Sequence, residues 1–234
     1  MPRCVIIGAG PVDPEQKELF LPGDYVIACD AGYRNAAALG VAPDLIVGDF
    51  DSAPRPETEN LVVLPAEKDD TDTHYAARLA VEKGFDEALI LGVLGGARLD
   101  HSLAAIAAGL WLAKQGPKVT IAGRGAVLRY VLPGRPARVP HDPEAYFSLF
   151  PLEGAAGGVC ITGAKYPLQN ARLVPDATLG ASNETRPGGA EVRVADGSLL
   201  CTMAQNPYEM GYQGMLTAAA ALQGETEFED VDTG

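Results

Sequence analysis

The chain has little of several residue types, and each scarcity excludes a class of protein. Its 234 residues include four cysteines and three histidines, with no CxxC pair and no zinc-ligand spacing, which excludes a disulfide-dense scaffold and a zinc module. Lysine and arginine number 18 against 31 aspartates and glutamates, so the formal net charge is -13. This shortage of positive charge argues against sequence-independent nucleic-acid binding, which needs clustered basic side chains.

Long apolar runs are also missing. No stretch of 18 apolar residues occurs, so we expect no membrane span. The first ten residues lack the pattern of a signal peptide, because their apolar run is short and a Gly/Pro turn follows at once. The cysteines sit in or beside apolar runs, where buried reduced thiols are expected, and we therefore predict a cytoplasmic protein. They are Cys4, Cys29, Cys160 and Cys201.

Two common nucleotide-binding signatures are absent. No GxxxxGK[ST] occurs, so the chain is not a P-loop NTPase, and Gly8-Ala9-Gly10 lacks the third glycine of GxGxxG. The acidic charge does not oppose nucleotide binding, because a divalent metal ion can bridge carboxylates to phosphates.

What the chain does have is apolar content for a sizeable core, at 47%. Up to about residue 125, short apolar runs alternate with helical patterns, which is typical of a mostly parallel sheet with helices on both faces. Strands are expected at 4–8, 25–29, 45–47, 61–64, 88–93 and 118–122, and helices at 14–21, 34–39, 71–83 and 102–114.

The pattern changes near residue 130. Short apolar runs separated by Gly, Pro and Asn turns predict an all-β sandwich, with strands at 126–132, 146–150, 158–162, 191–194 and 199–203. We therefore place an α/β domain over residues 1–130, a β-sandwich over 131–223 and a poorly ordered acidic tail over 224–234.

Aspartates gather where the strands of the α/β half end. Asp30 follows the second strand, and Asp49 and Asp51 follow the third. Ligands bind beyond the carboxyl ends of the strands in open α/β sheets, and several carboxylates there repel one another unless a cation is present. Asp49 and Asp51 are therefore predicted to bind a divalent metal ion, the alternative being a solvated acidic loop with Asx turns.

A second acidic segment opens a helix. Thr71 and Asp72 begin it, and helix capping alone explains a threonine and an acid there. Lys68 precedes them and offers a point charge to a phosphate, which favours a functional role.

A glycine-rich turn joins a strand to the next helix over residues 92–98. Gly95 and Gly96 let backbone N–H groups approach phosphate oxygens, and Arg98 offers a bidentate phosphate contact, although an ordinary tight turn is the alternative. Asp100 and His101 are candidates to cap the helix, to ligate a metal ion or to orient one another.

Together these segments resemble the thiamine pyrophosphokinase family. Matching motifs run in order through the chain to about residue 203. In the first half they are Asp30-Ala31-Gly32, Pro43 to Ser52, Lys68-Asp69-Asp70-Thr71-Asp72 and Gly95-Gly96-Ala97-Arg98-Leu99-Asp100-His101, and in the second half Gly163-Ala164-Lys165-Tyr166-Pro167-Leu168 and Ser182-Asn183-Glu184.

The resemblance implies a homodimer that transfers a diphosphate from ATP to the hydroxyethyl oxygen of thiamine, with Mg²⁺ as cofactor and AMP released. It places the nucleotide on the α/β domain and thiamine between subunits, with Ser182 and Asn183 near its pyrimidine. Catalytic candidates are Asp49, Asp72, Asp100 and Arg98; Mg²⁺ candidates are Asp49, Asp51, Asp72 and Asp100; nucleotide-binding candidates are Asp30, Gly32, Lys68, Thr71, Gly95, Gly96, Arg98 and His101.

Two other functions stay open. A diphosphokinase acting on a pterin alcohol would keep the chemistry and change the acceptor, but the motifs at 163–168 and 182–184 favour thiamine. A non-catalytic thiamine- or nucleotide-binding sensor has no need for so many unneutralised acids.

Overall fold

The chain folds into two compact units. The computed structural model describes residues 3–51, 53–65, 67, 69–123 and 125–205, so Lys68 and the predicted tail lie outside the described residues. Among the described residues, the first unit comprises those from 3 to 123 and 128–130, and the second comprises 125–127 and those from 131 to 205. Strand β7 (Ala126–Val131) is divided between them, and the predicted domain boundary at residue 130 falls inside it.

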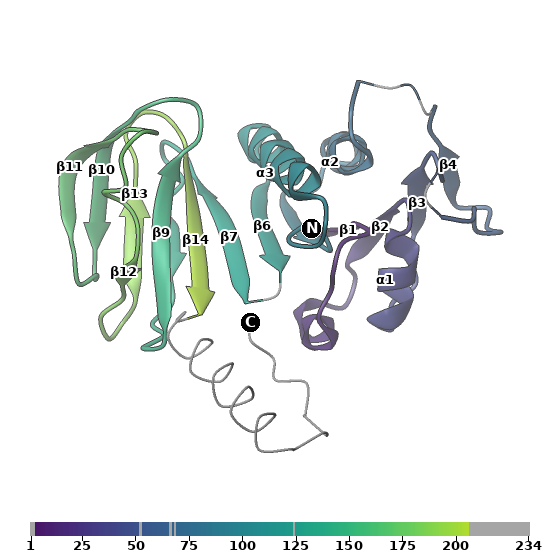
Figure 1. Ribbon diagram of the computed structural model, residues 1–234, viewed down its shortest axis with the longest axis horizontal. Coiled ribbons are helices and arrows are strands. Elements are labelled where there is room, and N and C mark those ends of the chain that lie inside the picture. The colour runs from purple at the N-terminus through teal and green to yellow at the C-terminus, as the bar shows by residue number, and fades with distance from the viewer. Residues whose placement is uncertain (1–2, 52, 66, 68, 124, 206–234) are drawn as a thin grey trace, which may run out of the picture. The chain divides into compact units, whose positions relative to one another are not determined.

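A parallel sheet with strand order β6-β5-β1-β2-β3-β4 is the centre of the first unit (Figure 1). The central strands are nearly continuous apolar runs because helices cover both faces of the sheet. The strands are β1 (Cys4–Ile7), β2 (Tyr25–Cys29), β3 (Leu45–Gly48), β4 (Leu61–Val63), β5 (Glu87–Leu91) and β6 (Lys118–Gly123).

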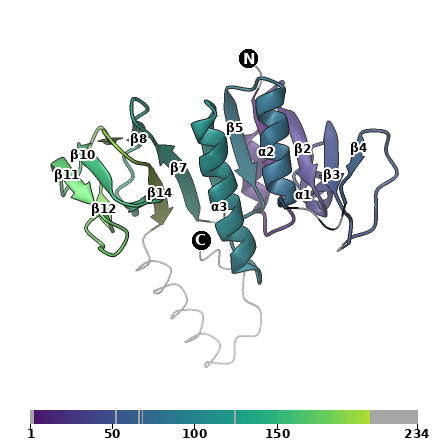
Figure 2. The same ribbon diagram turned by 90° about the horizontal axis from the view of Figure 1, so that it is seen from above.

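The connecting helices lie on opposite faces of this sheet. Helix α1 (Gly32–Ala38) covers one face, and α2 (Asp72–Glu82) and α3 (Leu99–Lys114) cover the other (Figures 1 and 2). Right-handed crossovers require this, because α1 leads from β2 to β3 while α2 and α3 lead in the opposite direction along the sheet. The predicted helix at 14–21 is a 3₁₀ helix, η1 (Pro14–Leu19), capped by Asp13.

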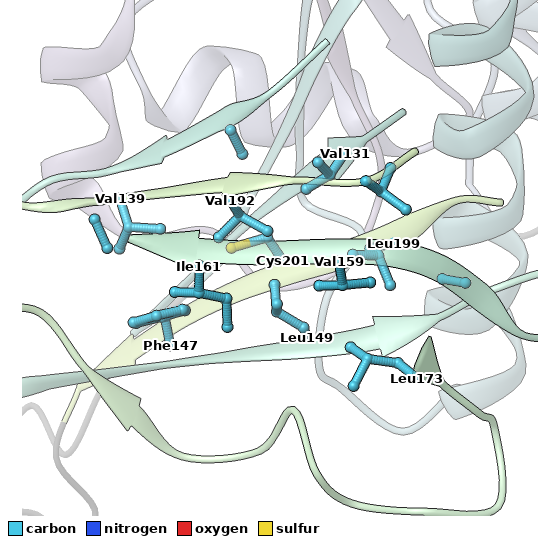
Figure 3. Close-up of a cluster of buried hydrophobic side chains, with 14 of the residues drawn as sticks. Val131, Val139, Phe147, Leu149, Val159, Ile161, Leu173, Val192, Leu199 and Cys201 are labelled. Carbon is cyan, nitrogen blue, oxygen red and sulfur yellow. The ribbon is translucent and has the colours of Figure 1, made fainter. Parts of the chain in front are cut away.

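The second unit is built from antiparallel strands in two layers. One layer has the order β11 (Leu168–Leu173), β10 (Ala156–Thr162), β13 (Ala190–Arg193), β8 (Ala137–Val139), and the other has β12 (Asn183–Glu184), β9 (Ala145–Pro151), β14 (Leu199–Gln205). In Figure 3, inward side chains from both layers meet in one apolar core, to which Phe147, Leu149, Leu199 and Cys201 belong. Their spacing of two is the period of a strand with one buried face.

At this level the predicted order, an α/β half followed by an all-β half, is confirmed. Cys4, Cys29 and Cys201 are buried, as predicted, and Cys160 is half-buried. Within the described part of the chain, no helix is both long enough and apolar enough to span a membrane.

Candidate active site

Four neighbouring strands end at one edge of the parallel sheet and present the predicted polar loops there. In the order β5, β1, β2, β3, their first following residues are Gly92, Gly8, Asp30 and Asp49. Ile7 is paired with both Leu91 and Ala28, and Cys29 with Val47, so the strands end at nearly the same level. We call this end of the sheet the strand-end edge. Open α/β sheets bind their ligands at this position.

Asp30 is held against the end of β3. Its backbone N–H donates to the carbonyl of Val47 at 2.7 Å, and a Cβ at Gly48 would approach Asp30 Cα to 2.9 Å. The φ of Asp30 is +48°, a left-handed backbone that costs a residue other than glycine about 1–3 kcal/mol. Gly32 is packed as tightly, since a Cβ there would lie 2.1 Å from the Ile7 carbonyl oxygen. Both predicted nucleotide-binding residues are thus fixed by the strand ends.

The acidic loop after β3 turns sharply. Asp49 is half-buried and Asp51 is exposed, and the Asp51 N–H donates to Asp49 Oδ1 at 3.4 Å. Phe50 between them has a φ of +56°. This local bond is the Asx contact of an acidic turn, and Asp51 faces solvent, where it is open to a metal ion or a phosphate-bound cation.

The first turn of α2 lies beside the end of β2. The Thr71 hydroxyl accepts the His74 N–H at 3.2 Å, which confirms the predicted cap. Asp72 follows in the first turn with its Oδ1 atom enclosed, and the Cys29 thiol donates to the Asp72 carbonyl at 3.6 Å. Burial raises the pKa of Cys29 well above its usual value, and the negative charge of Asp72 raises it further. This thiol therefore stays protonated.

Thr71→Ala is expected to lower the free energy of unfolding by about 1 kcal/mol, because the cap satisfies an amide at the start of α2. Thr71→Ser keeps the hydroxyl and should lose much less. Urea denaturation of the three proteins measures the difference. An alanine variant as stable as the parent would mean that Thr71 contributes no cap in solution.

Arg98 and Asp100 form an exposed bidentate ion pair. Arg98 donates from Nε to Asp100 Oδ1 at 2.9 Å and from Nη2 to Oδ2 at 2.7 Å, with the two side chains 66% and 64% exposed. The hydrogen bond from Arg98 lowers the pKa of Asp100 to about 2, and the same bond raises the pKa of Arg98. Each of these two predicted functional groups is therefore charged, and each neutralises the other.

The predicted start of this helix was wrong. Helix α3 begins at Leu99, three residues before the predicted Ser102, so Asp100 and the exposed His101 lie in its first turn and are not caps. Arg98 occupies the capping position without a side-chain cap bond. Glycines and an arginine before Leu99 carry no N-cap signal, which is why the start was missed.

The predicted metal ligands do not form a ready-made cage. Across residues 3–51, 53–65, 67, 69–123 and 125–205, no group of three or more His, Cys, Asp or Glu side chains converges as a metal site. Mg²⁺ does not need one, because it is usually held by one or two carboxylates together with water and substrate phosphates. The oxygen donors Asp49, Asp51, Asp72 and Asp100 therefore fit Mg²⁺ by chemistry, and their role as ligands stays a prediction.

In the second unit, Asn183 is buried and its amide is used inside the protein. It is 5% exposed; Oδ1 accepts the N–H groups of Tyr166 and Glu184 at 3.0 and 2.9 Å, and Nδ2 donates to the Tyr166 carbonyl at 2.8 Å. The neighbouring Ser182 is exposed with a φ of +55°, and its N–H donates to Ser148 Oγ at 2.9 Å. Asn183 thus braces the turn at 165–166, and the exposed Ser182 lies beside that brace.

Sequence reasoning missed Asn35, whose amide bonds to the loop after β1. The available signal was an asparagine set among alanines in a short helix, a residue type that favours caps and turns over helix interiors.

The fold and site define a class of two-part proteins, in which an α/β unit with an acidic strand-end edge precedes an all-β unit. Comparison with known families makes the class specific. Residues 17–121 match the model of the thiamin pyrophosphokinase catalytic domain, and residues 137–199 match that of the thiamin pyrophosphokinase vitamin B1 binding domain.

Individual relatives agree with these matches. A thiamine pyrophosphokinase from Bacillus subtilis is 32% identical over 165 residues, which span 68% of this chain and 77% of that protein. Crystal structures of thiamine pyrophosphokinases from Bacillus subtilis and Geobacillus thermodenitrificans both superpose with a TM-score of 0.76 over 87% of this chain, at 28% and 29% identity, covering 99% and 98% of those chains. The chain belongs to the thiamine pyrophosphokinase family.

Proposed function

We propose that the protein transfers a diphosphate from ATP to thiamine, giving thiamine diphosphate and AMP. Mg²⁺ is the cofactor, and the active protein is a homodimer. The observation that carries the proposal is the order of the two family matches, catalytic domain before vitamin B1 binding domain, on a chain whose catalytic match contains the acidic strand-end edge.

The reaction joins the hydroxyethyl oxygen of thiamine to the β-phosphorus of ATP. The bond between that phosphorus and the oxygen bridging to the α-phosphate breaks, AMP leaves, and the hydroxyl proton is lost. In such transfers the protein mainly positions the reactants and neutralises charge.

Bound Mg²⁺ would neutralise phosphate charge, with Asp49 and Asp51 as its first candidate ligands because they share one turn and Asp51 faces solvent. Arg98 would give a bidentate contact to the transferred group once it exchanges Asp100 for phosphate. That exchange costs little, because exposed ion pairs contribute little stability.

The acid that orients the hydroxyl and takes its proton is a choice between Asp72 and Asp100. With its pKa near 2 while paired, Asp100 is a weak base. Asp72, with one enclosed carboxylate oxygen in the first turn of α2, is therefore the stronger candidate. Thiamine would bind between subunits at the second unit, with Ser182 contacting the pyrimidine and Asn183 holding the turn beside it.

An acceptor assay tests this function. The purified protein with ATP and Mg²⁺ is expected to release AMP with thiamine, to release none with a pterin alcohol, and to stop when EDTA removes the metal. AMP release with the pterin alcohol alone would keep the reaction and change the acceptor. Binding of thiamine and ATP without AMP release under any condition would point to a sensor.

A further inference from the structure

The loops after β1 and β5 are joined by backbone hydrogen bonds at the strand-end edge. The Gly8 N–H donates to the Leu91 carbonyl at 2.8 Å, and the Gly10 N–H donates to the Gly92 carbonyl at 2.7 Å. A Cβ at Gly10 would come within 2.8 Å of that carbonyl oxygen, closer than real Cβ atoms approach. We call loops 8–11 and 92–98, joined in this way, the clasp.

Asn35, in helix α1, joins that helix to the clasp by hydrogen bonds. Its Nδ2 donates one hydrogen to the Gly8 carbonyl and one to the Gly10 carbonyl, both at 2.7 Å. Both donors of the amide are thus used on one loop, and the same nitrogen would lie 3.1 Å from a Cβ at Gly92. One side chain therefore fixes loop 8–11 directly and lies beside the start of loop 92–98.

Loop 92–98 carries the two glycines that the sequence predicts to bind phosphate, and Arg98, to which the proposed function assigns the transferred group. Gly95 and Gly96 are exposed with left-handed backbones, and Arg98 follows them. A Cβ at Gly96 would approach Pro11 Cδ to 3.2 Å, so the tip of this loop also lies against loop 8–11. The position of the glycines relative to the sheet therefore depends on loop 8–11, and that loop depends on Asn35.

We propose that Asn35 is a positioning residue for the triphosphate group of the nucleotide, acting through the clasp. This inference rests on the proposed function, because the nucleotide is the ligand assigned to loop 92–98. Asn35 needs no contact with the nucleotide for this role. Its loss should weaken the use of ATP and leave the use of thiamine nearly unchanged.

Two variants disturb the clasp from different sides. Asn35→Ala removes both amide donors. Gly10→Ala keeps Asn35 and forces a methyl group toward the Gly92 carbonyl; because the φ of Gly10 lies outside the left-handed region, this substitution tests only the contact. If the Asn35→Ala protein does not fold, the kinetics of Gly10→Ala alone test the proposal.

Matched controls separate positioning from general loss of stability. Arg3→Ala breaks the part-buried ion pair with Asp24 at the opposite end of β1. Gly157→Ala is the control for Gly10→Ala. It makes the same substitution where a methyl group fits, since a Cβ at Gly157 would lie 3.8 Å from the nearest neighbouring atom.

Steady-state kinetics and amide hydrogen exchange of Gly8 are the measurements. Both clasp variants are expected to raise KM for ATP about tenfold or more, to change KM for thiamine less than about twofold and to speed exchange of the Gly8 amide, which donates to the Leu91 carbonyl across the clasp. The controls should leave all three nearly unchanged. An unchanged KM for ATP in a folded clasp variant overturns the proposal, as does an equal rise in both KM values.

Failure of the proposed function would be seen separately. If the wild-type protein releases no AMP, that function fails, and the dissociation constant of ATP then decides the role of Asn35. A tenfold weaker constant in both clasp variants supports positioning of the nucleotide, and an equal constant overturns it.

Discussion

Asp72→Asn is expected to lower thiamine-dependent AMP release by about 10²- to 10³-fold while the protein stays folded. The side chain lies in the first turn of α2 with one oxygen enclosed at the strand-end edge, and asparagine keeps its shape while removing the charge that would orient the hydroxyl or a metal ion. Loss of the favourable interaction with the helix dipole should cost less than about 1 kcal/mol of unfolding free energy. Initial rates and urea denaturation measure the two effects.

Asp86→Asn is the matched control for this prediction. Asp86 is an exposed aspartate beyond the other end of α2, and the same substitution there should leave the rate within about twofold. A variant at Asp72 that unfolds would instead make the residue structural. A folded Asp72→Asn protein with full activity would remove Asp72 from the catalytic set.

Arg98→Ala is expected to reduce kcat/KM by about 10²-fold or more, because a bidentate cation for the transferred group is lost. It should also raise the pKa of Asp100 from about 2 toward the ordinary aspartate value, since the Arg98 hydrogen bond is the main cause of the lowered pKa. NMR titration of the Asp100 carboxyl carbon follows the second effect. Arg98→Lys should recover only part of the activity, because an ammonium group cannot give the two parallel bonds of a guanidinium.

The sign of the linked stability change follows from the lowered pKa. A depressed pKa in the folded protein means that the Asp100 pair stabilises the fold above the unfolded pKa of 3.8 and that this contribution is lost as the pH falls through about 2. The contribution is small, because solvent screens a pair this exposed. Arg98→Ala should abolish that part of the pH dependence.

Arg193→Ala serves as the matched control for Arg98→Ala. Arg193 pairs with Glu191 two residues away at 2.6 Å, as Arg98 pairs with Asp100, and it lies on strand β13 of the second unit. Its removal should leave kcat/KM within about twofold. Equal losses in both variants would mean that the effect of Arg98 is one of general surface charge.

Local chemistry made much of the first unit predictable. The parallel strands were marked by apolar runs, and α2 was bounded by the Thr71 cap and by Gly84, whose φ is +76°. The acids and glycines at the strand ends followed from the same pattern, because a parallel sheet gathers the ends of its strands at one edge. Pattern reasoning therefore predicted that these residues gather at one end of the parallel sheet, and the structure has Gly92, Gly8, Asp30 and Asp49 following the ends of β5, β1, β2 and β3.

Features that depend on tertiary contacts were not predictable. Strands β8, β11 and β12 were missed because they are short or largely polar: β12 is two residues long, and β11 is LQNARL. The roles of Asn35 and Asn183 were missed for a similar reason, since their partners are backbone atoms of distant segments. Another tertiary contact joins α2 and α3, where the ring of His74 lies 5.0 Å from that of Trp111.

Tracing the β-phosphate of ATP tests the central claim most directly. The protein is incubated with thiamine, Mg²⁺ and ATP labelled at the β-phosphate, and the products are separated. The account predicts that the label moves to thiamine diphosphate, with one unlabelled AMP released for each molecule formed. Labelled ADP together with thiamine monophosphate, or thiamine left unmodified by folded protein, would contradict it.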